Sequence, residues 1–121
     1  MNDANTTIDQ LKEQVKKYCE ERDWDKYHNL KDLAIGVITE ASELLEHFRF
    51  KSEKEMQEML NNTNKREEIS EEMADTLYFI VRMSQKYNID LSSAFERKMR
   101  KNRKNYPIDK ARGSNKKYSE L

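Results

Sequence analysis

The sequence has very few residues that interrupt regular backbone structure: two glycines and one proline among 121 residues. This shortage argues against a turn-rich architecture, because glycine and proline mark turns and chain breaks. Helix formers such as Lys, Glu, Leu and Met fill the chain instead. The composition therefore predicts an all-α protein, and the length suits one domain with a modest core.

Cysteine and long apolar runs are also scarce. The single cysteine, Cys19, excludes an internal disulfide and fits a reducing compartment. Its acidic neighbours Glu20 and Glu21 disfavour a thiolate, so a nucleophilic role is not expected. No apolar run approaches the ~18 residues that a membrane span needs, and the N-terminus lacks the apolar segment of a signal peptide. The expected location is the cytoplasm, with no membrane partner.

Neither sign of charge dominates the whole chain, but the two signs are unevenly placed. Residues 1–95 carry 13 Lys and Arg against 20 Asp and Glu, whereas residues 96–121 carry 10 against 3. An acidic body with a basic C-terminal end suits a metal site beside an anion-binding arm. A solvated basic tail is the simpler alternative.

Apolar spacing and capping residues divide the chain into helices. Thr7 and Gln10 have the spacing of a capping box, while Asn29 and Asp90 are expected N-caps. The expected helices cover residues 8–22, 30–48, 66–87 and 91–104, with a short helix around 56–60, a loop at 61–64, and a stop at Pro107. The chain 1–121 is thus predicted to be one domain of four to five helices, with residues 1–6 and about 108–121 flexible or arm-like.

Two acidic steps are the most informative motif: Glu40 with Glu43, and Glu72 with Asp75. Residues three apart are neighbours on a helix surface, where like charges repel unless a positive group lies between them. Two such pairs on helices that pack together predict a nest of carboxylates for a hard divalent cation, Mg²⁺ or Mn²⁺. Gly36 weakens the first of these helices, which makes sense if another group approaches its backbone there.

The apolar faces of the two acidic helices follow from a rotation of about 100° per residue. The first face holds Leu33, Ala34, Val37, Ile38, Ala41, Leu44, Leu45 and Phe48, and the second holds Met73, Leu77, Ile80, Val81, Met83, Ser84 and Tyr87. Both acidic steps lie at the borders of these faces, so we expect them beside a packed surface.

Other site chemistries have less support. A di-iron bundle needs Glu-x-x-His steps, but Leu44 stands three residues before His47, and His28 follows Asp25 instead of a glutamate. No glycine-rich phosphate loop is present, so phosphate binding has to come from a metal and from Lys and Arg side chains. Lys98 and Asn102 fall within the apolar face of the last helix, where they need partners such as phosphate oxygens or the acidic nest. The alternative leaves both in water.

Several motifs together resemble the all-α nucleoside triphosphate pyrophosphohydrolases of the MazG-like superfamily, and within it most closely the dCTP pyrophosphatase group. The resemblance runs from about residue 18 to 118 and departs from the family at Phe50, where Trp is common, and at Asn105, where Arg is common. The matching stretches are Glu21–Trp24, Glu40–Glu43 with Phe48–Phe50, Glu71–Asp75, Lys98–Pro107, Ala111–Ser114 and Lys117–Tyr118.

The resemblance implies a bundle that assembles into a dimer or a dimer of dimers. It also implies hydrolysis of a (deoxy)nucleoside triphosphate, most plausibly dCTP or a modified dCTP, to the monophosphate and pyrophosphate in nucleotide-pool sanitising. Mg²⁺ would bind to Glu40, Glu43, Glu72 and Asp75, with Glu43 or Glu71 accepting the proton of the attacking water. The remaining implied contacts are phosphate binding by Lys98, Asn102, Arg112 and Lys116, and base or sugar binding by Trp24, Phe50 and Phe79.

Two alternatives to an enzyme remain open at the level of sequence. One is a catalytically weak helical oligomer that binds nucleotide or a protein partner and uses its acidic pairs only structurally. The other is an acidic coiled-coil adaptor, which ranks last because the apolar faces are wider than a heptad seam and short loops break the helices. A nucleic acid polymer is not an expected partner in any of these interpretations.

Overall fold

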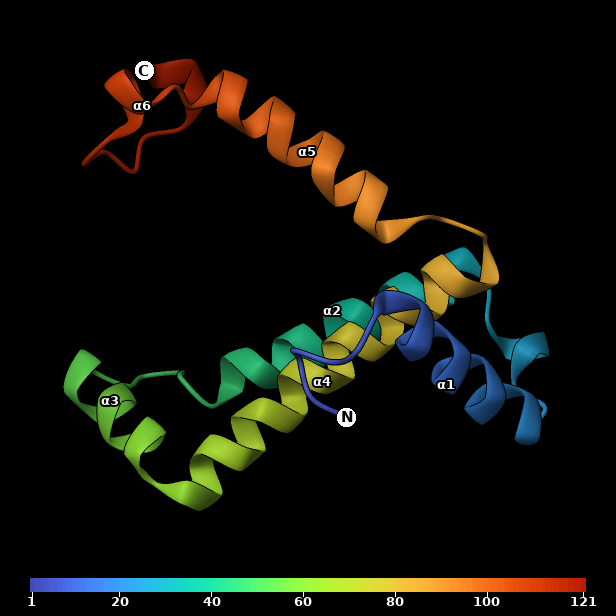
Figure 1. Ribbon diagram of the computed structural model, residues 1–121. Helices are drawn as coiled ribbons and strands as arrows, with labels where there is room; N and C mark the ends of the chain where they lie inside the picture. The colour runs from blue at the N-terminus through green and yellow to red at the C-terminus, as the bar shows by residue number, and fades with distance from the viewer. The chain divides into compact units, whose positions relative to one another are not determined.

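The computed structural model describes all residues from 1 to 121, and they form two units, Met1–Asn88 and Ile89–Leu121, each of which is described by itself. The chain contains helices and no strand (Figure 1). The elements are α1 (Ile8–Glu21), the 3₁₀ turn η1 (Asp25–Tyr27), α2 (Leu30–Glu46), α3 (Glu53–Asn61), α4 (Thr63–Lys86), α5 (Leu91–Asn105), α6 (Ile108–Ala111) and the 3₁₀ turn η2 (Tyr118–Glu120). The predicted all-α class is confirmed.

The helix starts in the first unit follow from local capping chemistry. Thr7 and Gln10 form the predicted capping box at the start of α1, and the Asn29 side chain accepts a hydrogen bond from the backbone N–H of Asp32 at the start of α2. The predicted loop at residues 61–64 is wrong, because Asn62 is the only residue between α3 and α4. Its side chain accepts from the backbone N–H of Lys65 and starts α4 at once.

Helices α2 and α4 form the centre of the first unit and run antiparallel, side by side (Figure 1). Helix α1 packs on α4, and so does the short α3. The fully or nearly buried apolar side chains are few: Cys19, Leu33, Ile69 and Val81. This core is small, and its members come from α1, α2 and α4.

Gly36 allows α2 and α4 to approach closely. A Cβ atom at this position would lie 2.5 Å from ring carbons Cδ1 and Cε1 of Phe79. Any side chain at residue 36 therefore overlaps the Phe79 ring, which rests against the backbone of α2. The expectation that another group approaches this backbone is confirmed, and that group is Phe79.

The predicted apolar faces are only partly buried. Leu33 and Val81 are enclosed, but Ile38 is 70% exposed, Leu45 65% and Met73 58%. The sequence-based arc combined two neighbouring stripes: one that packs in the α2–α4 contact and one that faces away from it. The second stripe, here called the outer apolar stripe, consists of Ile38, Leu45, Met73, Leu77 and Ile80.

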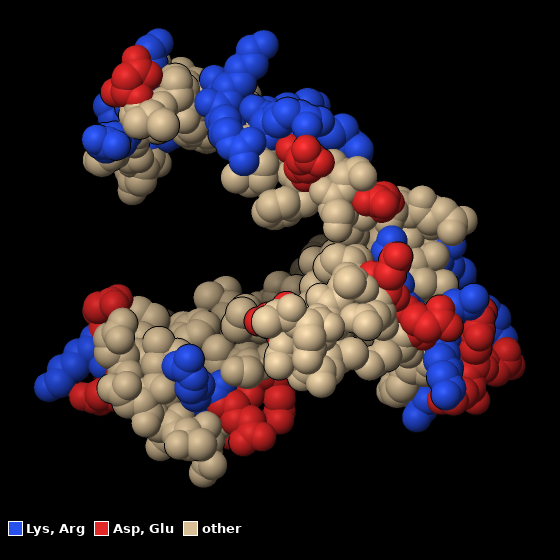
Figure 2. All heavy atoms as spheres, in the orientation of Figure 1, with Lys and Arg blue, Asp and Glu red and all other residues tan.

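The second unit contains more helix than the sequence predicted. Asp90 caps α5 by accepting from the backbone N–H of Ser93, as expected. The segment from residue 108, predicted to be loop or arm, instead contains α6 and η2, and Pro107 precedes α6 with a backbone angle φ of −63° that favours a helical start. The rings of Tyr106 and Tyr118 meet edge to face at 6.0 Å. Lys and Arg side chains cover much of α5 (Figure 2). No helix in either unit has the length and apolar character needed to span a bilayer.

Candidate active site

Three carboxylates from two helices converge between α2 and α4. One oxygen from each of Glu40, Glu43 and Glu72 lies within 4.8 Å of the others. Because α2 and α4 run antiparallel, the two acidic steps face each other across the helix contact. We call these three residues, together with the adjacent Asp75, the carboxylate cluster.

Two oxygens of this cluster have no partner in the protein. Oε2 of Glu40 and Oε2 of Glu72 are buried, and neither accepts a hydrogen bond. Buried polar atoms are nearly always paired, because leaving one unpaired costs roughly 1–3 kcal/mol. Unpaired oxygens of this kind indicate a site that is completed by something other than this chain.

The pKa values of the cluster also indicate that a positive group is missing from it. The pKa of Glu40 is raised to about 7, mainly by loss of solvent and then by the adjacent carboxyl of Glu43. The pKa of Glu72 is also raised, again mainly by loss of solvent and by Glu43, while hydrogen bonding with His47 opposes the shift. Nε2 of His47 lies 3.7 Å from Oε1 of Glu72. No Lys or Arg side chain forms an ion pair with the cluster, and His47 is the one basic residue within 4.0 Å of its oxygens.

The donor set suits a divalent cation. All of its ligand atoms are carboxylate oxygens, which are the donors that Mg²⁺ and Mn²⁺ prefer. A cation would satisfy the two unpaired oxygens and stabilise the ionised carboxylates, which loss of solvent and mutual repulsion disfavour. The residues present therefore fit a metal ion of this class.

A pocket of about 510 Å³ adjoins the carboxylate cluster. Aromatic and small side chains from α1, α4 and the segment after α1 form its walls, while carboxylates contribute on one side. Its lining residues are Gln14, Val15, Tyr18, Trp24, Glu40, Ala74, Asp75, Tyr78 and Phe79. This combination of flat apolar walls with an acidic edge suits a molecule that has an aromatic part and a part that binds metal.

Aromatic rings support one another around this pocket. Tyr18 contacts Trp24 edge to face at 5.5 Å and Tyr78 at 5.9 Å, and Tyr78 contacts Phe79 at 5.0 Å. The guanidinium of Arg22 lies 3.9 Å above the Tyr18 ring. The pocket wall is thus a connected series of rings with Trp24 at one end and Phe79 at the other.

Of the three residues predicted to bind the base or sugar, two line the pocket and one does not. Trp24 and Phe79 both line the pocket. Phe50 does not: its ring is 90% exposed, its backbone φ is +61°, and its nearest charged contact is the Arg49 guanidinium at 4.8 Å. Of the two predicted proton acceptors, Glu43 belongs to the carboxylate cluster, whereas the side chain of Glu71 is exposed and outside it.

The predicted phosphate-binding residues all lie in the second unit. Lys98 is exposed, and Asn102 is partly buried, with its backbone carbonyl accepting from Tyr106. Lys116 donates its backbone N–H to the Ser114 hydroxyl. Arg112 lines a pocket of about 780 Å³ together with Arg103, Tyr106, Ile108 and Asp109. Lys98, Arg112 and Lys116 are basic and exposed, Asn102 is neutral and partly buried, and the contact of all four with a nucleotide stays a prediction.

Sequence reasoning missed three residues of the site. His47 shares a helix column with Glu40 and Glu43, so its place beside Glu72 could have been found from helical phase. Tyr18 and Tyr78 gave no comparable signal, because aromatic residues at helical spacing usually belong to a core. Only the packing of α1 on α4 brings them to the pocket.

Comparisons with known proteins agree over nearly the whole chain. The pattern of the MazG-like family matches residues 35–121. The chain is 31% identical to dCTP pyrophosphatase 1 of Rattus norvegicus over 115 residues, which cover 95% of this chain and 68% of that protein. The same identity and coverage hold for dCTP pyrophosphatase 1 of Homo sapiens. A crystal structure of a pyrophosphatase from Archaeoglobus fulgidus DSM 4304 superposes with a TM-score of 0.78 at 31% identity, covering 88% of this chain and 98% of that one.

Proposed function

Because the chain belongs to the MazG-like family and is a nucleoside triphosphate pyrophosphohydrolase, we propose that it acts on dCTP or a modified dCTP. The products would be the monophosphate and pyrophosphate, and the role would be nucleotide-pool sanitising. The observation that supports this proposal most strongly is the pair of unpaired, buried carboxylate oxygens beside a pocket with aromatic walls. The relatives named dCTP pyrophosphatase 1 support the choice of base.

The proposed cofactor is Mg²⁺, with Mn²⁺ as a possible substitute, held by Glu40, Glu43, Glu72 and Asp75. A cation in this place supplies positive charge to the phosphate oxygens of the substrate. The cluster itself does two further things. It concentrates negative charge that only a cation relieves, and it offers Glu43, the most exposed of its three converging carboxylates, as an acceptor for the proton of the attacking water. Glu71 remains the alternative acceptor.

We assign the base and sugar to the pocket, with Trp24 and Phe79 as flat walls. The role predicted for Phe50 rests on the sequence resemblance alone, because its ring does not line this pocket. The triphosphate would be bound by Lys98, Asn102, Arg112 and Lys116 of the second unit. All four side chains carry hydrogen-bond donors, and the three Lys and Arg residues among them carry the positive charge that favours phosphate binding.

We also propose that two or four copies associate through the outer apolar stripe. Five large apolar side chains of α2 and α4 are exposed there, and only four apolar residues are buried in the chain. Figure 2 shows few charged atoms over this part of α2 and α4. A second copy would cover surface that costs free energy in water. Sedimentation of the native chain and of Ile38→Asp tests this: the native chain should exceed the mass of one chain, and the variant should approach it.

The proposed location is the cytoplasm, where a single reduced cysteine and a nucleotide substrate are both expected. The proposed partners are the nucleotide and further copies of the chain, with no nucleic acid polymer and no membrane.

The deciding experiment is incubation of the native chain with each dNTP and MgCl₂, followed by separate assays for pyrophosphate and orthophosphate. We expect pyrophosphate release, fastest with dCTP, and its loss on addition of EDTA. Glu43→Gln and Asp75→Asn should abolish release, while Glu67→Gln, an exposed glutamate of α4 outside the cluster, serves as the matched control. Hydrolysis that persists unchanged in EDTA contradicts the proposal. Nucleotide binding without hydrolysis would favour the alternative of a nucleotide-binding oligomer.

A further inference from the structure

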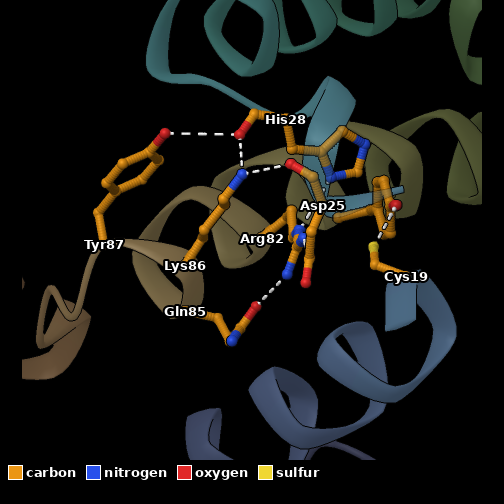
Figure 3. A network of polar contacts seen from close by, with 8 residues as sticks. Cys19, Asp25, His28, Arg82, Gln85, Lys86 and Tyr87 are labelled. Carbon is orange, nitrogen blue, oxygen red and sulfur yellow. Dashed lines mark hydrogen bonds and ion pairs between the residues drawn. The ribbon is translucent and has the colours of Figure 1, made fainter. Parts of the chain in front are cut away.

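Arg82 of α4 is the one charged side chain that is fully buried, at 1% exposure. Its guanidinium donates in three directions (Figure 3). Nε donates to Nδ1 of His28 at 2.9 Å, Nη2 to Oδ1 of Asp25, and Nη1 to Oε1 of Gln85. We call these four residues the Arg82 clamp.

The next residues of α4 hold the same segment by its backbone. Nζ of Lys86 donates to the carbonyl oxygens of Asp25, at 2.6 Å, and of His28. The Tyr87 hydroxyl donates to the His28 carbonyl at 3.4 Å (Figure 3). A single stretch of α4 thus binds both side chains and both carbonyls at the two ends of the segment 25–28.

The other polar contacts of this segment are local: backbone hydrogen bonds within the turn and the exposed ion pair of Lys26 with Asp23. The segment contains the three-residue turn η1, which has no side-chain cap. Runs of 3₁₀ helix this short have poor hydrogen-bond geometry and little stability of their own. The segment is entered through Asp23, whose backbone φ is +54°, a conformation that side-chain-bearing residues rarely adopt. The clamp therefore determines the position of the turn.

The ionisation of the clamp matches its hydrogen bonds. Hydrogen bonding to Arg82 lowers the pKa of the Asp25 carboxyl, which stays ionised as an acceptor. Loss of solvent, followed by the charge of Arg82, lowers the pKa of His28 and keeps its ring neutral, so that Nδ1 accepts from Nε of Arg82. Every donor group of the buried cation thus faces an acceptor.

The clamp is connected to the pocket through Trp24. The Trp24 carbonyl accepts from the backbone N–H of Tyr27, the last residue of η1, at 2.9 Å. The Trp24 ring contacts the ring of clamp residue His28 at 6.3 Å on one side and the ring of Tyr18 at 5.5 Å on the other. Trp24 is also part of the pocket wall. Movement of the turn therefore moves this wall.

We propose that Arg82 is a positioning residue: by fixing the turn 25–28 through Asp25 and His28, it holds the Trp24 ring in place as a preformed wall for the nucleotide base. This inference rests on the proposed function, because it assumes that the pocket receives the base. Loss of the clamp releases the wall, so the nucleotide must order it on binding and binds more weakly. The effect falls on KM more than on kcat, because the carboxylate cluster is untouched.

The only tryptophan of the chain provides a direct measurement, since Trp24 alone reports tryptophan fluorescence. We compare acrylamide quenching of the native chain with that of Arg82→Met and of the matched control Arg66→Met, an exposed arginine on the same helix. In the absence of nucleotide, Arg82→Met should raise the quenching constant about twofold as the turn opens locally. Its KM for dCTP should rise about tenfold, the size of one lost base–aromatic contact, with kcat changed much less. Arg66→Met should match the native chain in both measurements.

Two further variants keep the test decisive if Arg82→Met does not fold. Asp25→Asn keeps an oxygen acceptor for Nη2 of Arg82 at a side chain that is 54% exposed, so we expect this variant to fold and to shift quenching and KM in the same direction by a smaller amount. Arg82→Lys keeps the charge but not the three-way donation, and should lie between the native chain and Arg82→Met.

The outcomes separate the two proposals. Folded Arg82→Met or Asp25→Asn with native quenching overturns the clamp as a holder of Trp24. Raised quenching with native KM overturns its role in nucleotide binding and leaves Arg82 a purely structural residue. If the native chain hydrolyses no triphosphate, the proposed function fails, and with it the role of the clamp in substrate binding, while quenching still decides whether Arg82 holds Trp24.

Discussion

Helix α4 contributes to two clusters of charged groups, which differ in whether their buried polar atoms have hydrogen-bond partners. Around residue 72, carboxylates of one sign crowd together and leave two buried oxygens without partners. Around residue 82, a buried guanidinium meets an acceptor in each of its three directions. The two clusters lie about ten residues apart on the same helix, and both connect α4 to an earlier part of the chain.

This difference indicates that the carboxylate cluster is a binding site, whereas the Arg82 clamp holds parts of the fold together. A buried charge with all its hydrogen bonds made is tolerated, and removing one partner of such a set is strongly destabilising. A buried group of like charges is unfavourable by itself and becomes favourable when a cation binds. The carboxylate cluster is therefore the part of α4 that is completed by a ligand, whereas the Arg82 clamp is complete within the chain.

The strongest test of this contrast is Glu72→Gln in the carboxylate cluster. We expect pyrophosphate release to fall about 100-fold or more, because a metal ligand is lost. In EDTA the same variant should melt at a higher temperature than the native chain, because one source of like-charge repulsion is removed. Rates with MgCl₂ and melting curves with EDTA measure both effects. A variant that loses activity and also melts lower in EDTA would mean that the carboxylates stabilise the fold directly.

Gly36→Ala tests the packing of α2 against Phe79, a residue of the pocket wall that lies between the two clusters along α4. The new Cβ would overlap the Phe79 ring at 2.5 Å, so α2 and α4 must separate or the ring must move. We expect a loss of about 1–3 kcal/mol in the free energy of unfolding, measured by urea denaturation. The double variant Gly36→Ala with Phe79→Leu should recover part of this loss, because the two residues are in contact. Additive losses would show that the clash is relieved elsewhere.

The two clusters also differ in how far the sequence alone predicts them. Spacing of three residues on a helix is local information, so the acidic steps and their helices could be found by counting. The unpaired oxygens could not, because they depend on how closely α2 and α4 pack around Gly36. The same limit explains the outer apolar stripe: helical phase identifies apolar residues but not which neighbour covers them.

The Arg82 clamp lay beyond prediction for a related reason. Arg82 and Asp25 are 57 residues apart, and no periodic pattern connects a helix interior to a three-residue turn. Local chemistry predicted the caps Thr7, Asn29 and Asp90 correctly. It fails at residues 61–64, where a run of polar residues predicts a loop although one asparagine is enough to end α3 and cap α4.

The pH dependence of stability gives a third test, with a moderate effect. Glu40 is a carboxyl whose pKa in the folded chain is raised from 4.5 to about 7, so the folded state prefers it protonated. Its stabilising contribution is complete below about pH 4.5 and is lost as the pH rises through about 7. The lowered pKa of His28 acts in the opposite sense, since its contribution is lost as the pH falls below 6.5.

Comparison of the native chain with Glu40→Gln isolates the carboxyl from the histidine. In EDTA, the melting temperature of the native chain should fall relative to the variant by about 5 °C between pH 5 and pH 8. Saturating MgCl₂ should reverse most of this difference in the native chain, because the cation binds the ionised form. Parallel curves for the two proteins across this range would place the pH dependence outside the carboxylate cluster.

The smallest change in stability should come from loss of the contact between Cys19 and Tyr78, which lies between the two clusters. The thiol of buried Cys19 and the hydroxyl of Tyr78 lie 3.2 Å apart, and loss of solvent raises the pKa of Tyr78, so the phenol stays uncharged. Tyr78→Phe should cost about 1 kcal/mol in the free energy of unfolding, the usual net value of one neutral hydrogen bond. Because the Tyr78 phenol stays uncharged and lies outside the carboxylate cluster, this loss should be the same at pH 5 and pH 8 and the same with EDTA or MgCl₂. A loss that varies with pH or metal would show that Tyr78 is coupled to the carboxylate cluster. The aromatic pocket wall could then not be treated as independent of the charged groups beside it.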